Sequence, residues 1–149
     1  LYVDALLPVQ PMTDEEKAQC KKAIAEYKEI RPVVQLGNIY RLLSPYDHLG
    51  AASLMYVSDQ RDKAVWYWWK TENMYNVHIP RVKMAGLDPN RSYRVRELDR
   101  VDIKPLDCEG KVFTGRYLMD NGIDVPYTNE VEWGKKTDWS SRVLYLEAK

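Results

Sequence analysis

The side chains best suited to catalysis are few and widely spaced along the chain. Glu130 and Glu132 would share one face of a strand, and glycoside hydrolysis uses a pair of carboxylates that flank the scissile bond. A solvated acidic edge explains the same spacing and is the interpretation we favour. His48 and His78 have no second His or Cys at ligand spacing. The sequence therefore predicts no metal site and no catalytic residue within this chain.

Two further motifs favour turns over binding sites. Residues 120–124 (Asp-Asn-Gly-Ile-Asp) resemble a calcium loop but lack its regular ligand positions and its terminal Glu. The triplet Asn90-Arg91-Ser92 is formally a glycosylation sequon, but it falls within a natural turn. The sequence contains neither a glycine-rich nucleotide loop nor a G-x-S-x-G motif, so we expect no cofactor.

Composition restricts the class of protein further. The chain has 149 residues, with 22 Lys and Arg against 22 Asp and Glu, and a pI near 6.9. A nucleic-acid-binding domain would need a basic face, and no apolar run is long enough to span a bilayer. We therefore expect neither a nucleic-acid partner nor a membrane partner. Cys20 and Cys108 belong to no C-x-x-C pair, and we expect both to be free thiols.

Aromatic residues are unevenly represented, with 11 Tyr and 5 Trp against a single Phe. Such rings pack well on a pleated surface, so their number favours a β-rich domain. Trp and Tyr are also the residues that stack on sugars. A carbohydrate-binding β-sandwich module is therefore the alternative function, with Tyr75, Trp133 and Trp139 as its candidate sugar contacts.

The first regular element that the pattern predicts is a long helix over residues 13–36. Thr13 and Glu16 have the spacing of a capping box, and Gly37 is a suitable stop. An apolar stripe at helical spacing is formed by Ala18, Cys20, Ala23, Ile24, Tyr27 and Ile30. This stripe needs a cover, which the following β-domain, a second copy of the chain or another domain could supply.

After Gly37 the hydrophobic period changes from helical to alternating. Strands are predicted over residues 39–43, 51–58, 63–71, 79–85, 92–98, 112–114 and 141–147, with a helical turn over 115–121. Residues 65–69 (Val-Trp-Tyr-Trp-Trp) are apolar on both faces, which predicts a strand away from the sheet edge. The fold class expected is mainly β, an antiparallel Greek-key-type β-sandwich preceded by one long helix.

Several segments resemble, in the same order, the C-terminal region of α-galactosidases of glycoside hydrolase family 36. The first covers residues 27–35, with Gly37 and the Tyr-Arg-Leu-Leu-Ser-Pro run of 40–45. Others are the Gly-Leu-Asp-Pro turn at 86–89 with its following strand, and residues 115–119. Shorter matches lie at 63–65, 122–123 and 141–143, whereas residues 1–12, 97–112 and 123–138 depart from the family pattern.

The resemblance implies a retaining hydrolase of terminal α-galactosides, such as those of melibiose and raffinose. Its two catalytic aspartates would lie on a (β/α)8 barrel that precedes Leu1, so no catalytic role is assigned to any position here. We expect residues 1–37 to end this barrel and residues 38–149 to form the C-terminal β-sandwich. The expected partners are the missing barrel and its α-galactoside substrate, with a homo-oligomer left open.

Overall fold

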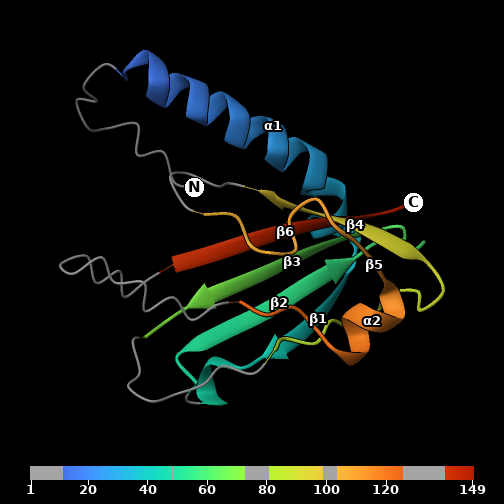
Figure 1. Ribbon diagram of the computed structural model, residues 1–149. Coiled ribbons are helices and arrows are strands. Elements are labelled where there is room, and N and C mark those ends of the chain that lie inside the picture. Colours follow the sequence, from blue (N-terminus) through green and yellow to red (C-terminus); the bar gives the residue numbers. More distant parts are fainter. Residues whose placement is uncertain (1–11, 48, 73–80, 99–103, 126–139) are drawn as a thin grey trace.

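The computed structural model describes residues 12–47, 49–72, 81–98, 104–125 and 140–149 (Figure 1). In chain order the elements are α1 (Asp14–Leu36), β1 (Asn38–Leu43), the 3-10 turn η1 (Pro45–Asp47), β2 (Ala51–Val57), β3 (Lys63–Lys70), β4 (Ser92–Leu98), β5 (Val112–Thr114), α2 (Gly115–Asp120) and β6 (Ser140–Ala148). The expected architecture, mainly antiparallel β with one long helix, is confirmed.

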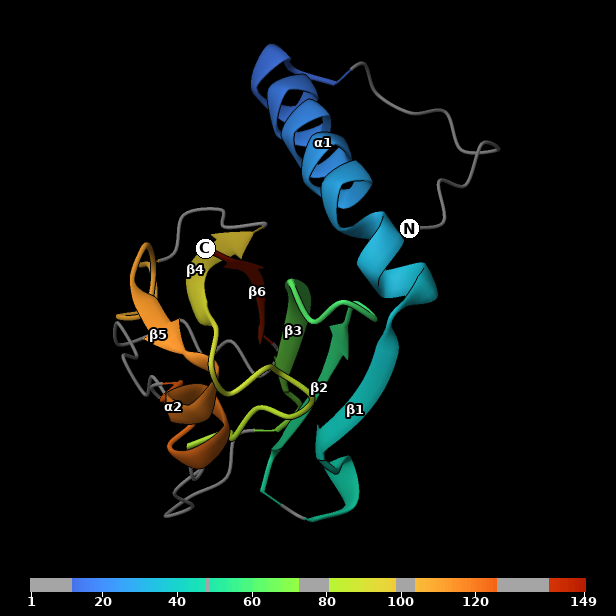
Figure 2. The ribbon, with the colours of Figure 1, turned by 90° about the vertical axis from the view of Figure 1, so that its right-hand side faces the viewer.

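The described strands form a six-stranded sheet in the order β1-β2-β3-β6-β4-β5. Every pair is antiparallel, and β6 lies between β3 and β4. β3 is therefore an inner strand, as its apolar sequence predicts. Figure 2 shows α1 on one side of this sheet and α2 on the other.

The prediction of a strand over residues 79–85 is wrong for residues 81–85, the part that the structure describes. Residues 81–85 have no ladder partner, and only Val82 forms an isolated bridge, with Ile123. Val82 and Met84 are buried, which explains the strand-like alternation in the sequence. The segment ends at Gly86, whose φ of +77° and close approach to the Tyr40 ring leave no space for a side chain.

The core lies on the face of the sheet that α2 covers, called here the inner face. Trp66 is fully buried there and Trp68 is 3% exposed. The opposing layer within the described residues consists of the 82–87 segment, α2, and loop residues around Leu106 and Ile123. Apolar side chains from both layers form a single cluster, which gives the domain its main hydrophobic stabilisation.

The long helix begins and ends as its sequence predicts. Thr13 and Glu16 form a complete capping box, and Gly37 caps the C-terminus. Gly37 has an extended backbone, and glycine is needed there because a Cβ would lie 2.5 Å from the Val33 carbonyl oxygen and 2.7 Å from that of Val57. Among the described helices, none is long and apolar enough to cross a membrane.

The turn over residues 86–91 is fixed by Tyr93. The buried Tyr93 hydroxyl accepts a hydrogen bond from the Asp88 backbone N–H at 3.0 Å and donates one to the Arg61 carbonyl at 2.5 Å. Burial raises the pKa of Tyr93, so this hydroxyl keeps its proton. The tyrosine thus ties two neighbouring turns together at one end of the sheet.

Candidate functional site

Most of the side chains that the sequence singled out lie outside the described residues. These are the carboxylates Glu130 and Glu132, the histidines His48 and His78, and the predicted sugar contacts Tyr75, Trp133 and Trp139. Their roles remain predictions. In the described ranges, no three His, Cys, Asp or Glu side chains come together as a group that could hold a metal ion.

The remaining predicted positions adopt ordinary structural roles. Residues 120–124 form the end of α2 and a turn through Gly122, whose φ is +68°. Asn90 lies exposed in the 86–91 turn. Cys20 is an exposed free thiol, and Cys108 is a buried free thiol whose pKa is raised to about 11 by burial.

The most distinctive surface is the other face of the sheet, called here the outer face. Tyr56, Tyr67 and Trp69 form a row of rings across β2 and β3 and are all partly buried. The Tyr56 and Tyr67 rings meet edge to face with centroids 6.2 Å apart, and the Tyr67 and Trp69 rings stack at 5.5 Å with planes 5° apart. Burial raises the pKa of Tyr67, as do the nearby hydroxyls of Tyr56 and Tyr27.

The C-terminal third of α1 covers only part of the outer face. Ile30 and Val33 are buried there in a small cluster with Val65, Leu98 and Tyr145. This cluster is separate from the main core. It anchors one end of the helix over the β3–β6 pair.

An ion pair reinforces this anchor. The Arg96 guanidinium donates to the Glu29 carboxylate at 2.6 Å and lies over the Tyr145 ring, 5.3 Å from its centroid. The bond to Glu29 raises the pKa of Arg96. Burial raises the pKa of Tyr145 to about 12, so this ring is uncharged under the arginine.

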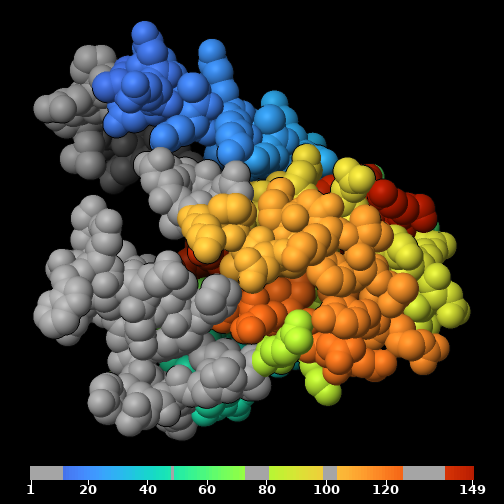
Figure 3. Space-filling model, in the orientation of Figure 1, coloured from blue at the N-terminus to red at the C-terminus, as the bar shows by residue number. Residues whose placement is uncertain are grey.

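Towards its N-terminus, α1 leaves the sheet. Ile24 is 55% exposed and Tyr27 is 50% exposed, although both belong to the predicted apolar stripe. Of that stripe, only Ile30 is buried. Figure 2 shows the helix rising from the sheet, and in Figure 3 its N-terminal half forms a ridge at the upper left of the molecule.

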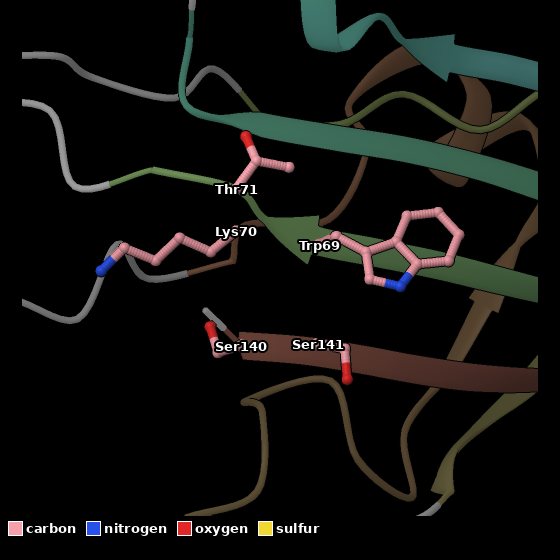
Figure 4. A pocket seen from close by; sticks show the side chains of 5 residues that line it. All are labelled: Trp69, Lys70, Thr71, Ser140 and Ser141. Atoms are coloured by element: carbon pink, nitrogen blue, oxygen red, sulfur yellow. The ribbon is translucent and has the colours of Figure 1, made fainter. Parts of the chain in front are cut away.

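A hollow of about 320 Å³ lies at the end of β3 and the start of β6. Its lining comprises Trp69, Lys70, Thr71, Ser140 and Ser141 (Figure 4). Trp69 and Ser141 are directly opposite each other in the β3–β6 register, as are Lys70 and Ser140. Because side chains alternate along a strand, Trp69 and Ser141 belong to the outer face, whereas Lys70 and Ser140 belong to the inner face.

A buried ion pair on the inner face was not anticipated from the sequence. The Glu97 side chain is 1% exposed; it accepts from Arg142 at 2.8 Å and from the Leu106 backbone N–H at 3.0 Å. Arg142 also donates to the Lys104 carbonyl. The available signal was the position of Glu97, which shares a strand face with the core residues Tyr93 and Val95. The pair fastens the 104–109 loop to the sheet.

The family model for the glycosyl hydrolase family 36 C-terminal domain matches residues 51–146. The chain belongs to this family. The region matched begins with β2 and includes almost all of β6, so it covers most of the sheet and the inner layer. The family 36 resemblance seen in the sequence is thereby confirmed.

Curated relatives of this family 36 chain are much longer proteins. The chain is 31% identical over 142 residues to α-galactosidase AgaA of Geobacillus stearothermophilus, which covers 95% of the chain and 17% of the relative. It is 34% identical over 142 residues to α-galactosidase Mel36A of Lactobacillus acidophilus, with the same coverage of 95% and 17%. The chain thus spans about a sixth of the length of these relatives.

Solved α-galactosidase structures share the fold. The α-galactosidase of Lactobacillus brevis matches with a TM-score of 0.73 at 27% identity, over 93% of this chain and 17% of that one. A variant of AgaA in complex with stachyose matches with a TM-score of 0.72 at 29% identity, over 96% and 17%. Both matches include the long helix together with the sheet, because so little of the chain is left out.

Proposed function

We propose that the chain is the C-terminal, non-catalytic region of an α-galactosidase, a retaining hydrolase of terminal α-galactosides. In this proposal residues 1–37 end the catalytic (β/α)8 barrel, and residues 38–149 form the C-terminal β-domain. The α-galactosidase relatives and the short span of the chain along them support the assignment. The catalytic carboxylates would then lie in the preceding part of the polypeptide.

The observation that carries the proposal is the apolar surface between α1 and the outer face, which the described residues cover only in part. Ile24 and Tyr27 on the helix are at least half exposed, and Tyr67 and Trp69 on the sheet are only partly buried. An apolar helical stripe of this kind is stabilised only when a second surface removes it from water. The occupant we propose is the remainder of the same polypeptide, because most of the length of the relatives lies outside the matched region.

Activity measurements test the catalytic part of the proposal. The complete polypeptide should hydrolyse nitrophenyl α-galactoside, and the 149-residue chain alone should give no turnover above buffer. Turnover by the chain alone would contradict the assignment of catalysis to the preceding region. Absence of α-galactosidase activity in the complete polypeptide would contradict the proposed family activity.

Stability measurements test whether the rest of the polypeptide covers the apolar stripe of α1. Ile24→Ser and Tyr27→Ser should lower the melting temperature of the complete polypeptide and leave that of the 149-residue chain unchanged, because the two side chains are covered only in the former. Lys21→Ser and Lys28→Ser on the polar side of the helix are matched controls and should change neither. Equal effects of the two apolar substitutions in both proteins would contradict docking on this stripe.

A further inference from the structure

We propose that the buried pair of Glu97 and Arg142 fixes the register of β6 in the sheet. By doing so, the pair selects which side chains of β6 belong to the outer face, where α1 is anchored. The inference goes beyond the proposed function and does not depend on it. It gives the two residues a positioning role in addition to their attachment of the 104–109 loop.

The hydrophobic pattern of β6 leaves its register open. Leu144 and Leu146 are fully buried in the main core, whereas Val143 and Tyr145 belong to the outer cluster with α1. A shift of a strand by one residue exchanges its two faces and keeps the ladder of backbone hydrogen bonds, because both alternate with a period of two. Both faces of β6 are apolar, so burial of apolar area discriminates poorly between the two registers.

The neighbouring strand β3 does not remove this ambiguity. β6 lies between β3 and β4 (Figure 1), and residues 65–68 of β3 pair with residues 142–145. Val65 and Tyr67 face the outer side of the sheet, and Trp66 and Trp68 face the core. Large apolar side chains would therefore surround β6 on either face in either register. A polar contact is needed to distinguish them.

The buried ion pair supplies this contact. The Glu97 carboxylate, which is 1% exposed, accepts from the Arg142 guanidinium at 2.8 Å. In the shifted register that brings Val143 to the inner face, Arg142 turns to the outer face and Ser141 takes its place. Glu97 would then be a buried carboxylate without a cationic partner, which is strongly unfavourable. The pair therefore favours the observed register over this shifted one.

The exposed ends of β6 contribute differently. The ion pair between Lys63 and Glu147 joins β3 to β6 at 3.9 Å, but both side chains are exposed, and surface pairs of this kind stabilise little. Glu147 does prevent a shift in the opposite direction, because its carboxylate would enter the fully buried position of Leu146. The first shift is therefore the one that the buried pair must prevent.

The register of β6 matters for the outer face because α1 is anchored there. Tyr145 packs in one cluster with Ile30 and Val33 of the helix, and its ring lies 5.3 Å from the Arg96 guanidinium. In the shifted register Leu144 would take the place of Tyr145, and the contact with the guanidinium would be lost. A pair that is buried on the inner face thus positions the surface on which α1 rests.

Nuclear magnetic resonance of the labelled 149-residue chain tests the inference through the double variant Glu97→Leu with Arg142→Met. The unsubstituted chain should give one set of signals, with backbone contacts between Tyr67 and Val143, which are directly opposite each other. The double variant should fold and give a second set with about a tenth or more of the total intensity, in which Tyr67 contacts residue 142 instead. In that second set Tyr145 should lose its contacts with α1.

A matched control removes the exposed ion pair of β6 instead. Lys63→Met with Glu147→Gln takes away both charges but keeps a polar side chain at position 147, so a single set of signals should remain. Arg142→Lys, which retains the cation, should also keep one set. A single native set in the Glu97→Leu, Arg142→Met variant would overturn the inference, as would two sets in the control. Failure of that variant to fold would overturn it as well, because the pair would then be needed for stability and not for register.

Discussion

The two faces of the sheet carry similar apolar side chains but are covered to very different extents. On the inner face Trp66 is fully buried, Trp68 is 3% exposed, and α2 with its adjoining loops completes a core. On the outer face Tyr67 and Trp69 are only partly buried, and α1 covers one end alone.

This difference shows that the described residues supply a full partner for only one of the two apolar surfaces. An alternating strand with large apolar residues on both sides is stable when both sides are covered. The inner layer meets this requirement from within the chain. The outer face and the stripe on α1 require another surface, which is why we assign them to the remainder of the polypeptide.

Neighbouring tryptophans on opposite faces give the sharpest test of the comparison. Trp68→Ala should lower the free energy of unfolding of the 149-residue chain by about 3–5 kcal/mol, the usual loss for a buried Trp. Trp69→Ala should lower it by only about 1.5 kcal/mol, mostly through the lost ring stacking. Urea unfolding followed by circular dichroism measures both, and equal losses would refute the unequal cover of the two faces.

The buried Glu97–Arg142 pair gives the next largest effect. Arg142→Ala should destabilise the chain by about 3 kcal/mol, because it leaves the Glu97 carboxylate buried without its cationic partner. The double variant Glu97→Leu with Arg142→Met should lose less, since no unpaired charge remains. A double variant that loses the sum of the two single changes would show that the residues act independently.

The sequence predicted the strands well because their signals are local. The alternation in β1 to β4 and in β6, the capping box at Thr13 and the turn at Gly86 depend on neighbouring residues. Which apolar side chains become buried depends on tertiary contacts. The sequence predicts the apolar stripe on α1, but it does not predict that Ile30 is buried and Ile24 exposed. The 81–85 segment was misread because burial alone, without a pairing partner, produces strand-like alternation.

The candidate site was harder to predict for the same reason. The stack of Trp69 on Tyr67 follows from their spacing of two residues on one strand, and this signal was available. The hollow beside it also requires β6, which comes from the other end of the chain, so its composition depends on tertiary structure. The Glu97–Arg142 pair is equally long-range.

The reactivity of the two cysteines measures how exposed α1 and the inner core are, and it requires no substitution. Cys20 on the free part of α1 should react with a thiol reagent at least ten-fold faster than Cys108 in the inner core, because burial holds Cys108 as a thiol. Mass spectrometry of the labelled chain distinguishes the sites. In the complete polypeptide Cys20 should also become protected; similar rates for both thiols in the chain would contradict the burial of Cys108.

Alkaline pH should weaken the inner core through the same thiol. Burial raises the pKa of Cys108 from its ordinary value of 9.0 to about 11, so the folded chain retains a proton that the unfolded chain loses. This contribution to stability is complete below pH 9 and declines as the pH rises towards 11. Cys108→Ser should flatten the decline between these values relative to the unsubstituted chain.

The smallest effect is expected where α1 is anchored. Arg96→Ala should lower the free energy of unfolding by about 0.5 kcal/mol, because both partners of its ion pair with Glu29 are nearly half exposed.

Hydrogen exchange should show amides of residues 16–27 exchanging well before those of β3 and β6. Equal protection of the helix and the strands would mean that α1 is stabilised along its whole length in the chain alone.

The position of β6 between β3 and β4 has a consequence for synthesis. Because β6 follows all the other described strands in the sequence, the β1-β2-β3 meander and the β4-β5 pair emerge from the ribosome before the strand that joins them. During that interval β3, with its row of large apolar side chains, is an open sheet edge that favours pairing with other chains. Nascent chains of this protein should therefore depend on chaperones, and translation that stops before Ser140 should yield aggregates.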